Sequence, residues 1–377
     1  GLGDVYKRQG DKNKARKVFA LSILMGLVVT AIVVAGSLIF MDGLLDWMNV
    51  MDEHREASVA YITVIIVGLF FSIIYNVLAA NLRAIGDAYT PLIFLIISAV
   101  LNVVLDILCV KYMDMGVRGA AVATIVSQAV SAVLCFGYTW KKYAFLHFNI
   151  KDFVPKKEFL KPMLEGGLSM GLMNSLVSFG TLSLQTAINT LGTNTIVAHA
   201  ATRKLTNLYM LPFSVLGTTM ATYSGQNYGA GRYDRIRAGL KVSLGCSYIW
   251  CVIVLIASYT VCPYLIVAIT DTGISEVIDT ACLYQRFDTC FYLLVPTITI
   301  LRNSLQGMGD HITPIFSSGL ELVGKVLIAM LLTPVIGYWG IIVSEPIVWA
   351  VMVIPLIVSM VKRMKRAFVN EKIRNEK

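Results

Sequence analysis

Ten long apolar runs constrain this chain more than any other feature of its sequence. An α-helix rises about 1.5 Å per residue, so about 20 apolar residues cross the roughly 30 Å hydrocarbon core of a bilayer. The runs are continuous and do not alternate in polarity, which favours membrane helices over the strands of a membrane barrel. The predicted spans are 18–41, 59–81, 91–110, 117–139, 166–190, 196–223, 239–269, 280–302, 314–333 and 338–361.

Composition excludes the other broad classes of protein. Of the 377 residues, 56% are apolar and 15% are charged, and the mean hydropathy is +0.71. Soluble domains carry about 25% charged residues, so this chain has too few to cover a soluble surface. A soluble globular protein and a disordered chain are both excluded. The fold class is therefore an all-α polytopic membrane protein.

Lysine and arginine gather on one side of the predicted spans. The N-terminal stretch, residues 140–165, the loop at 230–241 and the C-terminal tail are rich in both, whereas the opposite loops hold only Arg55, Lys111 and Arg118. Because basic loops stay on the cytoplasmic side, we expect a multi-pass protein of the cell membrane with both termini in the cytoplasm. The same rule accounts for the net charge of +9, so we expect contact with anionic lipid and no nucleic-acid partner.

Cysteine and histidine patterns give no sign of a metal centre. The seven cysteines lie in or beside apolar runs without a CxxC spacing, and the four histidines are scattered. We interpret the cysteines as packing residues in the membrane, and we expect no metal and no bound cofactor.

The sequence repeats itself at a separation of 221 to 223 residues. The stretch from Gly10 to Arg16 resembles the one from Gly231 to Arg237, and Gly86-Asp87-Ala88-Tyr89-Thr90-Pro91 matches Gly309-Asp310-His311-Ile312-Thr313-Pro314. Helices one to four therefore correspond to helices seven to ten. An even number of helices in each unit predicts a parallel repeat about an axis along the membrane normal.

The repeat implies an unequal division of the chain. We predict a four-helix N-terminal bundle at 1–142, a cytoplasmic interfacial linker at 143–165, and a six-helix C-terminal bundle with its basic tail at 166–377. Spans 166–190 and 196–223 precede the second copy of the repeat, and nothing equivalent precedes the first. We therefore expect a truncated first bundle that lacks two helices. The alternative is a genuine ten-helix protein.

Asp106 is the best candidate for a functional group inside a span. Asn102 lies one helical turn before it, in a run that is otherwise apolar. A carboxylate beside a carboxamide can hold a hard cation or a proton, and Thr124 and Tyr61 on neighbouring helices would complete an oxygen-rich pocket. A structural hydrogen-bond network near the helix end explains the same residues equally well.

Other polar residues within spans have weaker claims. Glu321 and Lys325, where Lys325 falls opposite Asn102 in the repeat, have the spacing of a structural ion pair. Glu345 is a lone acid. We expect Arg286 and Asp288 to reach outward to the membrane surface.

Helix 166–190 carries a polar stripe, for which a cavity wall and simple helix packing are equally good explanations. The candidates for a substrate cavity are Asn174, Gln185 and Asn189 of this helix, together with Arg203, which could face a cavity with Lys204.

Two further motifs have simple interpretations. The stretch Gly319–Lys325 fits the spacing of a phosphate-binding loop, but Val326 follows where Ser or Thr is needed, and the stretch lies within an apolar span. Nucleotide binding is therefore rejected. The two Gly-Asp-x-x-Thr-Pro loops are predicted to be turns in which Thr90 or Thr313 caps the following helix.

These motifs together resemble the multidrug and toxic compound extrusion (MATE) family over about residues 10–363. The resemblance is carried by Arg83–Asp87 with Thr90-Pro91, by Leu101-Asn102 with Leu105-Asp106, by Gly119–Thr124, by Gly225–Ala230 and by Leu301–Gly309. It implies a twelve-helix transporter with two six-helix lobes, and cation-coupled antiport of amphipathic organic cations. The helices seen here would be the family's third to twelfth.

The resemblance also implies a set of site residues. One branch of the family forms a cation site in its N-lobe from an Asp of the first helix, a Tyr of the fourth, Asn and Asp of the fifth and Thr of the sixth. The last four match Tyr61, Asn102, Asp106 and Thr124, and the first-helix Asp has no counterpart. Another branch uses acids in the seventh and tenth helices. Helix 166–190 has no acid and 280–302 is expected to have none deep in it, so the chain resembles the N-lobe branch.

The predicted function is secondary antiport, by a monomer, of small organic compounds against inward protons or sodium ions, and not an enzymatic reaction. A flippase of lipid-linked saccharides has the same superfamily architecture and is the first alternative, but it needs a more cationic cavity than Arg203 and Lys204 suggest. A membrane-embedded enzyme such as a prenyl transferase needs clustered acids such as DDxxD, which the sequence lacks.

Overall fold

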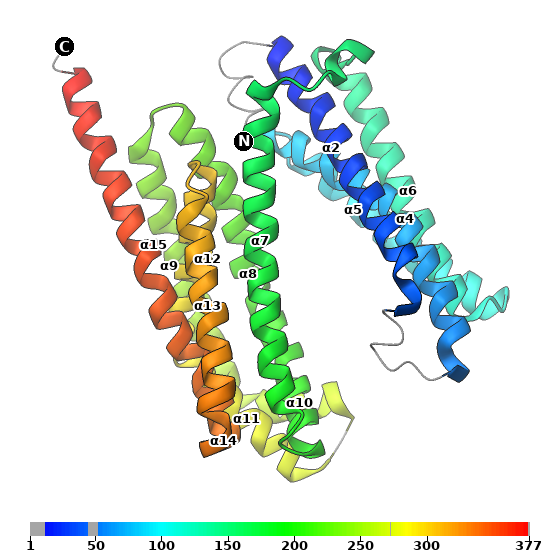
Figure 1. The fold of residues 1–377 in the computed structure, drawn as a ribbon, viewed down its shortest axis with the longest axis vertical. Coiled ribbons are helices and arrows are strands. Elements are labelled where there is room, and N and C mark those ends of the chain that lie inside the picture. The colour runs from blue at the N-terminus through cyan, green and yellow to red at the C-terminus, as the bar shows by residue number, and fades with distance from the viewer. Residues whose placement is uncertain (1–11, 44–51, 272, 376–377) are drawn as a thin grey trace. The chain divides into compact units, whose positions relative to one another are not determined.

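The computed structural model describes residues 12–43, 52–271 and 273–375, and within these ranges the chain is helical with no β-strand (Figure 1). The start of the first repeat motif, Gly10 and Asp11, lies outside the described residues. The long helices are α2 (Lys12–Ile39), α4 (Asp52–Ala84), α5 (Tyr89–Asp106), α6 (Gly116–Lys142), α7 (Lys157–Ile188), α8 (Thr193–Gly229), α9 (Tyr233–Thr260), α11 (Ser275–Thr289), α12 (Leu294–Gly307), α13 (Ile312–Leu331) and α15 (Tyr338–Asn375).

Short elements connect these helices. A π-helical segment, η1 (Ile107–Tyr112), continues α5, and α10 (Cys262–Thr270) follows α9. The remaining short segments are the 3₁₀ turns η2 (Ala144–Leu146) and η3 (Ile150–Phe153) and the single turn α14 (Thr333–Ile336).

Each predicted span corresponds to helical structure, but two of them are interrupted. Span 239–269 divides into α9 and α10 at Val261, just before Pro263, which cannot continue the backbone ladder of a helix. Span 280–302 divides into α11 and α12 around residues 290–293. The apolar pattern alone gives no signal for the second break.

Seven helical segments within the described ranges are long and apolar enough to cross a membrane. The predicted spans outside these seven, 166–190, 196–223 and 280–302, form α7, α8 and the α11–α12 pair. Helices α7 and α8 carry more polar residues than these seven, whereas α11 and α12, with 15 and 14 residues, are each too short to cross a membrane alone. These more polar helices contribute much of the candidate site described below.

The outer faces of the apolar helices are exposed in the way that lipid contact requires. Ile32, Ile96 and Val133 have 66%, 55% and 68% of their surfaces accessible, on α2, α5 and α6. A soluble protein does not expose such extensive apolar faces, so this arrangement fits a hydrocarbon environment.

The helices fall into two compact units, Gly1–Met163 and Leu164–Lys377. In the first unit α6 packs against α4 and α5, and in the second α15 packs against α12 and α13. The predicted linker at 143–165 differs from the observed chain, because residues 157–165 already belong to α7. Pro162 lies inside that helix, where proline has no N–H to donate to the carbonyl oxygen of Glu158, so one bond of the helical ladder is missing there.

The rest of the linker packs against the first unit. Phe148 contacts the rings of Phe19, Trp140 and Phe153, and the Asp152 carboxylate lies 2.9 Å from Arg16 Nε. These contacts fix the segment to the end of α2, since an aromatic cluster and an ion pair act on it together.

The two Gly-Asp-x-x-Thr-Pro loops have matching structures, and their capping residue is aspartate. Asp87 accepts the backbone N–H of Thr90 at 3.2 Å, and Asp310 accepts that of Thr313 at 3.1 Å. Thr90 and Thr313 each lie in the first turn of a helix, so the prediction that they cap it was wrong. The carboxylate is favoured because it reaches an N–H group of that turn and carries a charge that suits the helix dipole.

The last helix of each repeat supplies further partners to these aspartates. Tyr138 and Lys142 of α6 bind Asp87, and Ser359 and Arg363 of α15 bind Asp310. Both pairs of partners are 221 positions apart, which extends the repeat from sequence to hydrogen bonding. Burial opposes ionisation, yet the hydrogen bonds and the nearby Arg363 hold the pKa of Asp310 below its ordinary value.

Helices α8 and α12 approach each other closely at small residues. A Cβ atom on Gly307 would lie 2.1 Å from the carbonyl oxygen of Ala221, and one on Gly225 would lie 2.9 Å from the carbonyl oxygen of Gly307. Backbones can come this near only where side chains are absent, which is how small residues bring membrane helices together. These glycines belong to two of the motifs that carry the family resemblance.

We predict that Gly307→Ala lowers the thermal stability of the purified protein in detergent by several degrees, since the new methyl group would overlap the Ala221 carbonyl. Gly319→Ala is the matched control, because no atom lies within 4 Å of a Cβ built at that helical position. Fluorescence-detected thermal unfolding measures both. Equal stability of the two variants would contradict the close approach.

Candidate functional site

A chain of alternating charges lies inside the C-terminal unit. Arg302 Nη2 is 3.5 Å from Glu321 Oε2, Glu321 Oε1 is 3.0 Å from Lys325 Nζ, and Lys325 Nζ is 3.6 Å from Glu345 Oε1. Glu345 Oε1 is in turn 2.9 Å from Arg203 Nη1. Two carboxylates are thus shared among three cations, and each carboxylate serves two of them.

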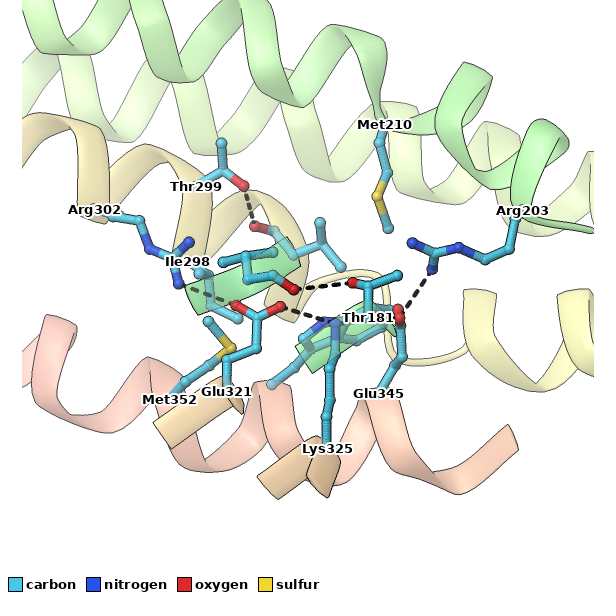
Figure 2. Close-up of a pocket in the computed structure, with 13 residues that line it drawn as sticks. Thr181, Arg203, Met210, Ile298, Thr299, Arg302, Glu321, Lys325, Glu345 and Met352 are labelled. Carbon is cyan, nitrogen blue, oxygen red and sulfur yellow. Dashed lines mark hydrogen bonds and ion pairs between the residues drawn. The ribbon is translucent and has the colours of Figure 1, made fainter. Parts of the chain in front are cut away.

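Four helices supply these side chains. Arg203 comes from α8 and Arg302 from α12, while α13 contributes Glu321 and Lys325 and α15 contributes Glu345. Figure 2 shows the two arginines approaching from opposite sides, with Glu321, Lys325 and Glu345 between them. The Glu321–Lys325 pair predicted from its spacing is present, but it is only the middle of a longer network.

The network lines a cavity of about 220 Å³. Its lysine and both glutamates are at least nine-tenths buried. The other walls are mainly apolar, with two threonines among them: Val177, Thr181, Met210, Val295, Ile298, Thr299, Trp349 and Met352 (Figure 2). A small pocket with apolar walls and a few convergent polar groups is the usual form of a ligand site.

In the N-terminal unit, the predicted residues Asn102 and Thr124 meet between α5 and α6. Asn102 Nδ2 donates to Thr124 Oγ1 at 3.5 Å. One turn further along α6, Gln128 accepts a hydrogen bond from Ser72 of α4 at 3.1 Å. Sequence reasoning missed this second contact, although Gln128 lies on the same helical face as Thr124. Polar contacts therefore connect α6 to both of its neighbours.

Asp106 lies at the junction of α5 and the π-helical segment η1, where the backbone ladder changes register. Its Oδ1 atom is buried and has no hydrogen-bond partner in the described part of the chain. π-Helical turns occur frequently at functional sites, and nothing in the sequence indicated one here. Tyr61 of α4 is 37% exposed and no contact joins it to Asp106 in the structure.

The repeat places the two polar centres at equivalent positions. Asn102 and Lys325 are 223 residues apart, and Thr124 and Glu345 are 221 apart. The neutral contact of 3.5 Å in one unit therefore corresponds to the ion pair of 3.6 Å in the other. The two copies of the repeat thus share the arrangement of helices but differ in the side chains at these positions, which are neutral in one copy and charged in the other.

The remaining cavity candidates lie in different surroundings. Arg203 lines the C-terminal cavity, as the sequence suggested, whereas Lys204 is exposed. Asn174 is also exposed. Gln185 donates a hydrogen bond to Asn189 at 2.9 Å, and neither residue lines the cavity. From helix 166–190, Val177 and Thr181 line the cavity instead.

The expectation that Arg286 and Asp288 reach outward was wrong. Asp288 is completely buried, and Arg286 donates from Nε to the Ser258 carbonyl oxygen while its guanidinium lies over the Tyr259 ring. The break between α11 and α12 explains the error, because it places Asp288 at an internal helix end. The further expectation of no deep acid in 280–302 fails for the same reason.

Sequence and structure comparisons agree on the family. The MatE family model matches residues 8–108 and 170–339, which include Asn102, Asp106 and most of the charge network. The chain belongs to the MatE family. This confirms the resemblance seen in the motifs, and it places the chain among membrane transporters rather than enzymes.

Relatives of this MatE protein are named for drug resistance. It is 31% identical over 176 residues to the probable multidrug resistance protein YpnP of Bacillus subtilis, covering 47% of this chain and 39% of YpnP. It is 24% identical over 351 residues to the multidrug export protein MepA of Staphylococcus aureus, covering 89% of this chain and 74% of MepA.

Solved MATE structures have the same fold. One is an outward-facing multidrug resistance MATE family transporter of the MOP superfamily, with a TM-score of 0.89 and 22% identity over 97% of this chain and 82% of that chain. Another is MATE in the bent conformation, with a TM-score of 0.89 and 20% identity over 98% of this chain and 82% of that chain. This confirms the predicted all-α polytopic fold.

We predict that Glu345→Gln destabilises this MatE protein markedly, because it leaves the buried Lys325 and the partly exposed Arg203 without the charge they share. Removing one member of a buried ion pair typically costs about 3–5 kcal/mol. Glu276→Gln is the matched control, since Glu276 is exposed and glutamine keeps an oxygen for its Asn194 contact. Thermal unfolding in detergent measures both, and an unchanged midpoint for Glu345→Gln would show that the network contributes little.

Proposed function

We propose that this MatE protein is a secondary antiporter of the cell membrane that exports small amphipathic organic compounds in exchange for inward protons or sodium ions. The observation that carries the proposal is the environment of Asp106. One carboxylate oxygen is buried without a hydrogen-bond partner in the described chain, and the Asn102–Thr124 contact lies one turn away. A carboxylate kept in this state within an apolar helix pair suits reversible binding of a cation.

In this proposal Asp106 binds the coupling ion, and Asn102 and Thr124 supply neutral oxygen atoms beside it. Tyr61 would join them in another conformational state, since it is partly exposed in this one. The π-helical turn after Asp106 supports the assignment, because a local change of register lets a helix adjust around a bound ion without unfolding.

The two helix units act as the lobes of an alternating-access transporter in this proposal, and the chain works as a monomer. Both termini lie in the cytoplasm, which agrees with the lysines and arginines near residues 141–161 and 362–377. The partners are the transported small molecule and the surrounding lipid.

The lipid-linked saccharide flippase is less well supported. Its diphosphate cargo requires a strongly cationic cavity, and in the C-terminal cavity Glu321 and Glu345 alternate with the three cations. The names of the relatives, multidrug resistance and multidrug export proteins, favour drug efflux instead.

We predict that Asp106→Asn abolishes ion-driven export, because asparagine cannot exchange a proton or carry the charge that holds a cation. The full-length gene product, reconstituted in proteoliposomes, is given a proton gradient or a sodium gradient separately, and movement of a fluorescent organic cation is recorded. We expect transport by this variant to fall to the level of empty vesicles with either gradient.

The matched control is Asp114→Asn. Asp114 is exposed in the loop after η1 with a φ of 51°, a left-handed conformation that asparagine also adopts readily. This control should transport like the unmodified protein. Gradient-driven transport by Asp106→Asn at the control's rate would exclude Asp106 as the coupling group.

A further inference from the structure

We propose that the cavity of the C-terminal unit binds the carboxylate group of a small amphipathic ligand, with Arg302 as its recognition residue. This inference rests on the proposed transport function and adds a substrate class, organic carboxylates and zwitterions, to the organic cations with which that function is tested. Three observations support it: the charge balance of the cavity, the incomplete hydrogen bonding of Arg302, and the apolar character of the remaining wall.

The charges that line the cavity do not balance. Arg203, Arg302 and Lys325 carry three positive charges, and Glu321 and Glu345 carry two negative ones. The buried Asp288 lies outside this lining and interacts with Arg203 and Lys325, whereas Glu321 is the only acid that interacts with Arg302 among the described residues. In a region of low dielectric constant a surplus cation is costly, so the Arg302 end of the cavity favours one further anion. A ligand that brings a single carboxylate would complete the alternation of charges.

Arg302 is the cation with the fewest contacts. Its side chain is 11% exposed and its Nη2 lies 3.5 Å from Glu321 without a hydrogen bond. Its buried Nε has no hydrogen-bond partner among the described residues. Arg203, at the other end of the network, makes a 2.9 Å contact with Glu345. The guanidinium thus keeps donor capacity beyond its ion pair with Glu321, and such a group is suited to hydrogen bonds with a carboxylate.

The cavity also accommodates an organic group beside that carboxylate. Ile298 and Met352 form an apolar wall near the arginine, and Met210 points into the same space (Figure 2). Trp349 is a further apolar residue of the cavity lining. Methionine side chains adapt to ligands of different shape, and tryptophan offers an aromatic face. An inorganic anion would leave this wall without contact, so the arrangement favours an aromatic or aliphatic carboxylate.

Direct binding measurements test the proposal. The full-length gene product in lipid nanodiscs is titrated with 2-naphthoate, with the neutral 2-naphthamide and with 2-naphthylmethylammonium by isothermal titration calorimetry. We expect naphthoate to bind about tenfold more tightly than either of the other two, which is the usual scale for one charge-assisted hydrogen-bonded pair. Equal affinities, or preference for the ammonium compound, would overturn the proposal and leave Arg302 as a hydrated structural cation only.

Variants then locate the binding site. We expect Arg302→Gln to remove the preference for naphthoate, and Arg302→Lys to weaken it because the forked donors are lost while the charge remains. Arg286→Gln is the control, since Arg286 lies over Tyr259 outside the cavity. Undiminished naphthoate preference in a folded Arg302→Gln protein would also overturn the proposal. If neither Arg302 variant folds, the comparison of the three probes on the unmodified protein still decides.

Binding is measured without an ion gradient, so the outcome is separate from that of the coupling experiment. Failure of naphthoate to bind would leave coupling through Asp106 unaffected. Loss of the coupling assignment would leave the carboxylate preference measurable.

Discussion

Charge placed within a hydrocarbon slab has to be met by charge from the protein itself, because no bulk water solvates it there. The C-terminal unit meets this constraint with the series Arg302–Glu321–Lys325–Glu345–Arg203, in which each carboxylate lies between two cations. Removing any one member would take a partner away from a neighbouring charge, which is costly in a medium of low dielectric constant. These ion pairs connect α8, α12, α13 and α15 in the interior of the unit.

The repeat shows which parts of the framework are structural and which are open to change. In both copies an aspartate caps the helix after a glycine turn and is held by two residues of the last helix. That interaction fixes the start of a helix, and the same side-chain chemistry is found in both copies of the repeat. The chemistry differs where Asn102 and Thr124 correspond to Lys325 and Glu345, because a polar contact between neighbouring helices can be made by neutral groups or by an ion pair.

The hydropathy of a helix is linked to its place around the cavity. The helices that most resemble membrane spans expose their apolar faces, as α2, α5 and α6 do. The less apolar segments α7, α8 and α12 reach the same membrane fold because they turn threonines, arginines and close glycine contacts inward. A polar residue in such a helix costs little when its partner is a neighbouring helix. The helices with the weakest hydrophobic signal thus form much of the cavity wall.

The sequence by itself determined the membrane fold, the helical spans and the internal repeat, because run length and helical spacing are local properties of the chain. It proposed Thr124 as a neighbour of Asn102, but their contact joins two helices and was decided by packing. It also indicated the Glu321–Lys325 pair, which is four residues apart on one helix. It could not show that Glu345, Arg203 and Arg302 complete the network, since these residues come from three other helices and meet only through packing. Nor could it place Asp288, whose burial depends on the break between α11 and α12. Only the tertiary structure decided these features, because the partner of a buried charge is set by distance in space and leaves no periodic pattern along the chain.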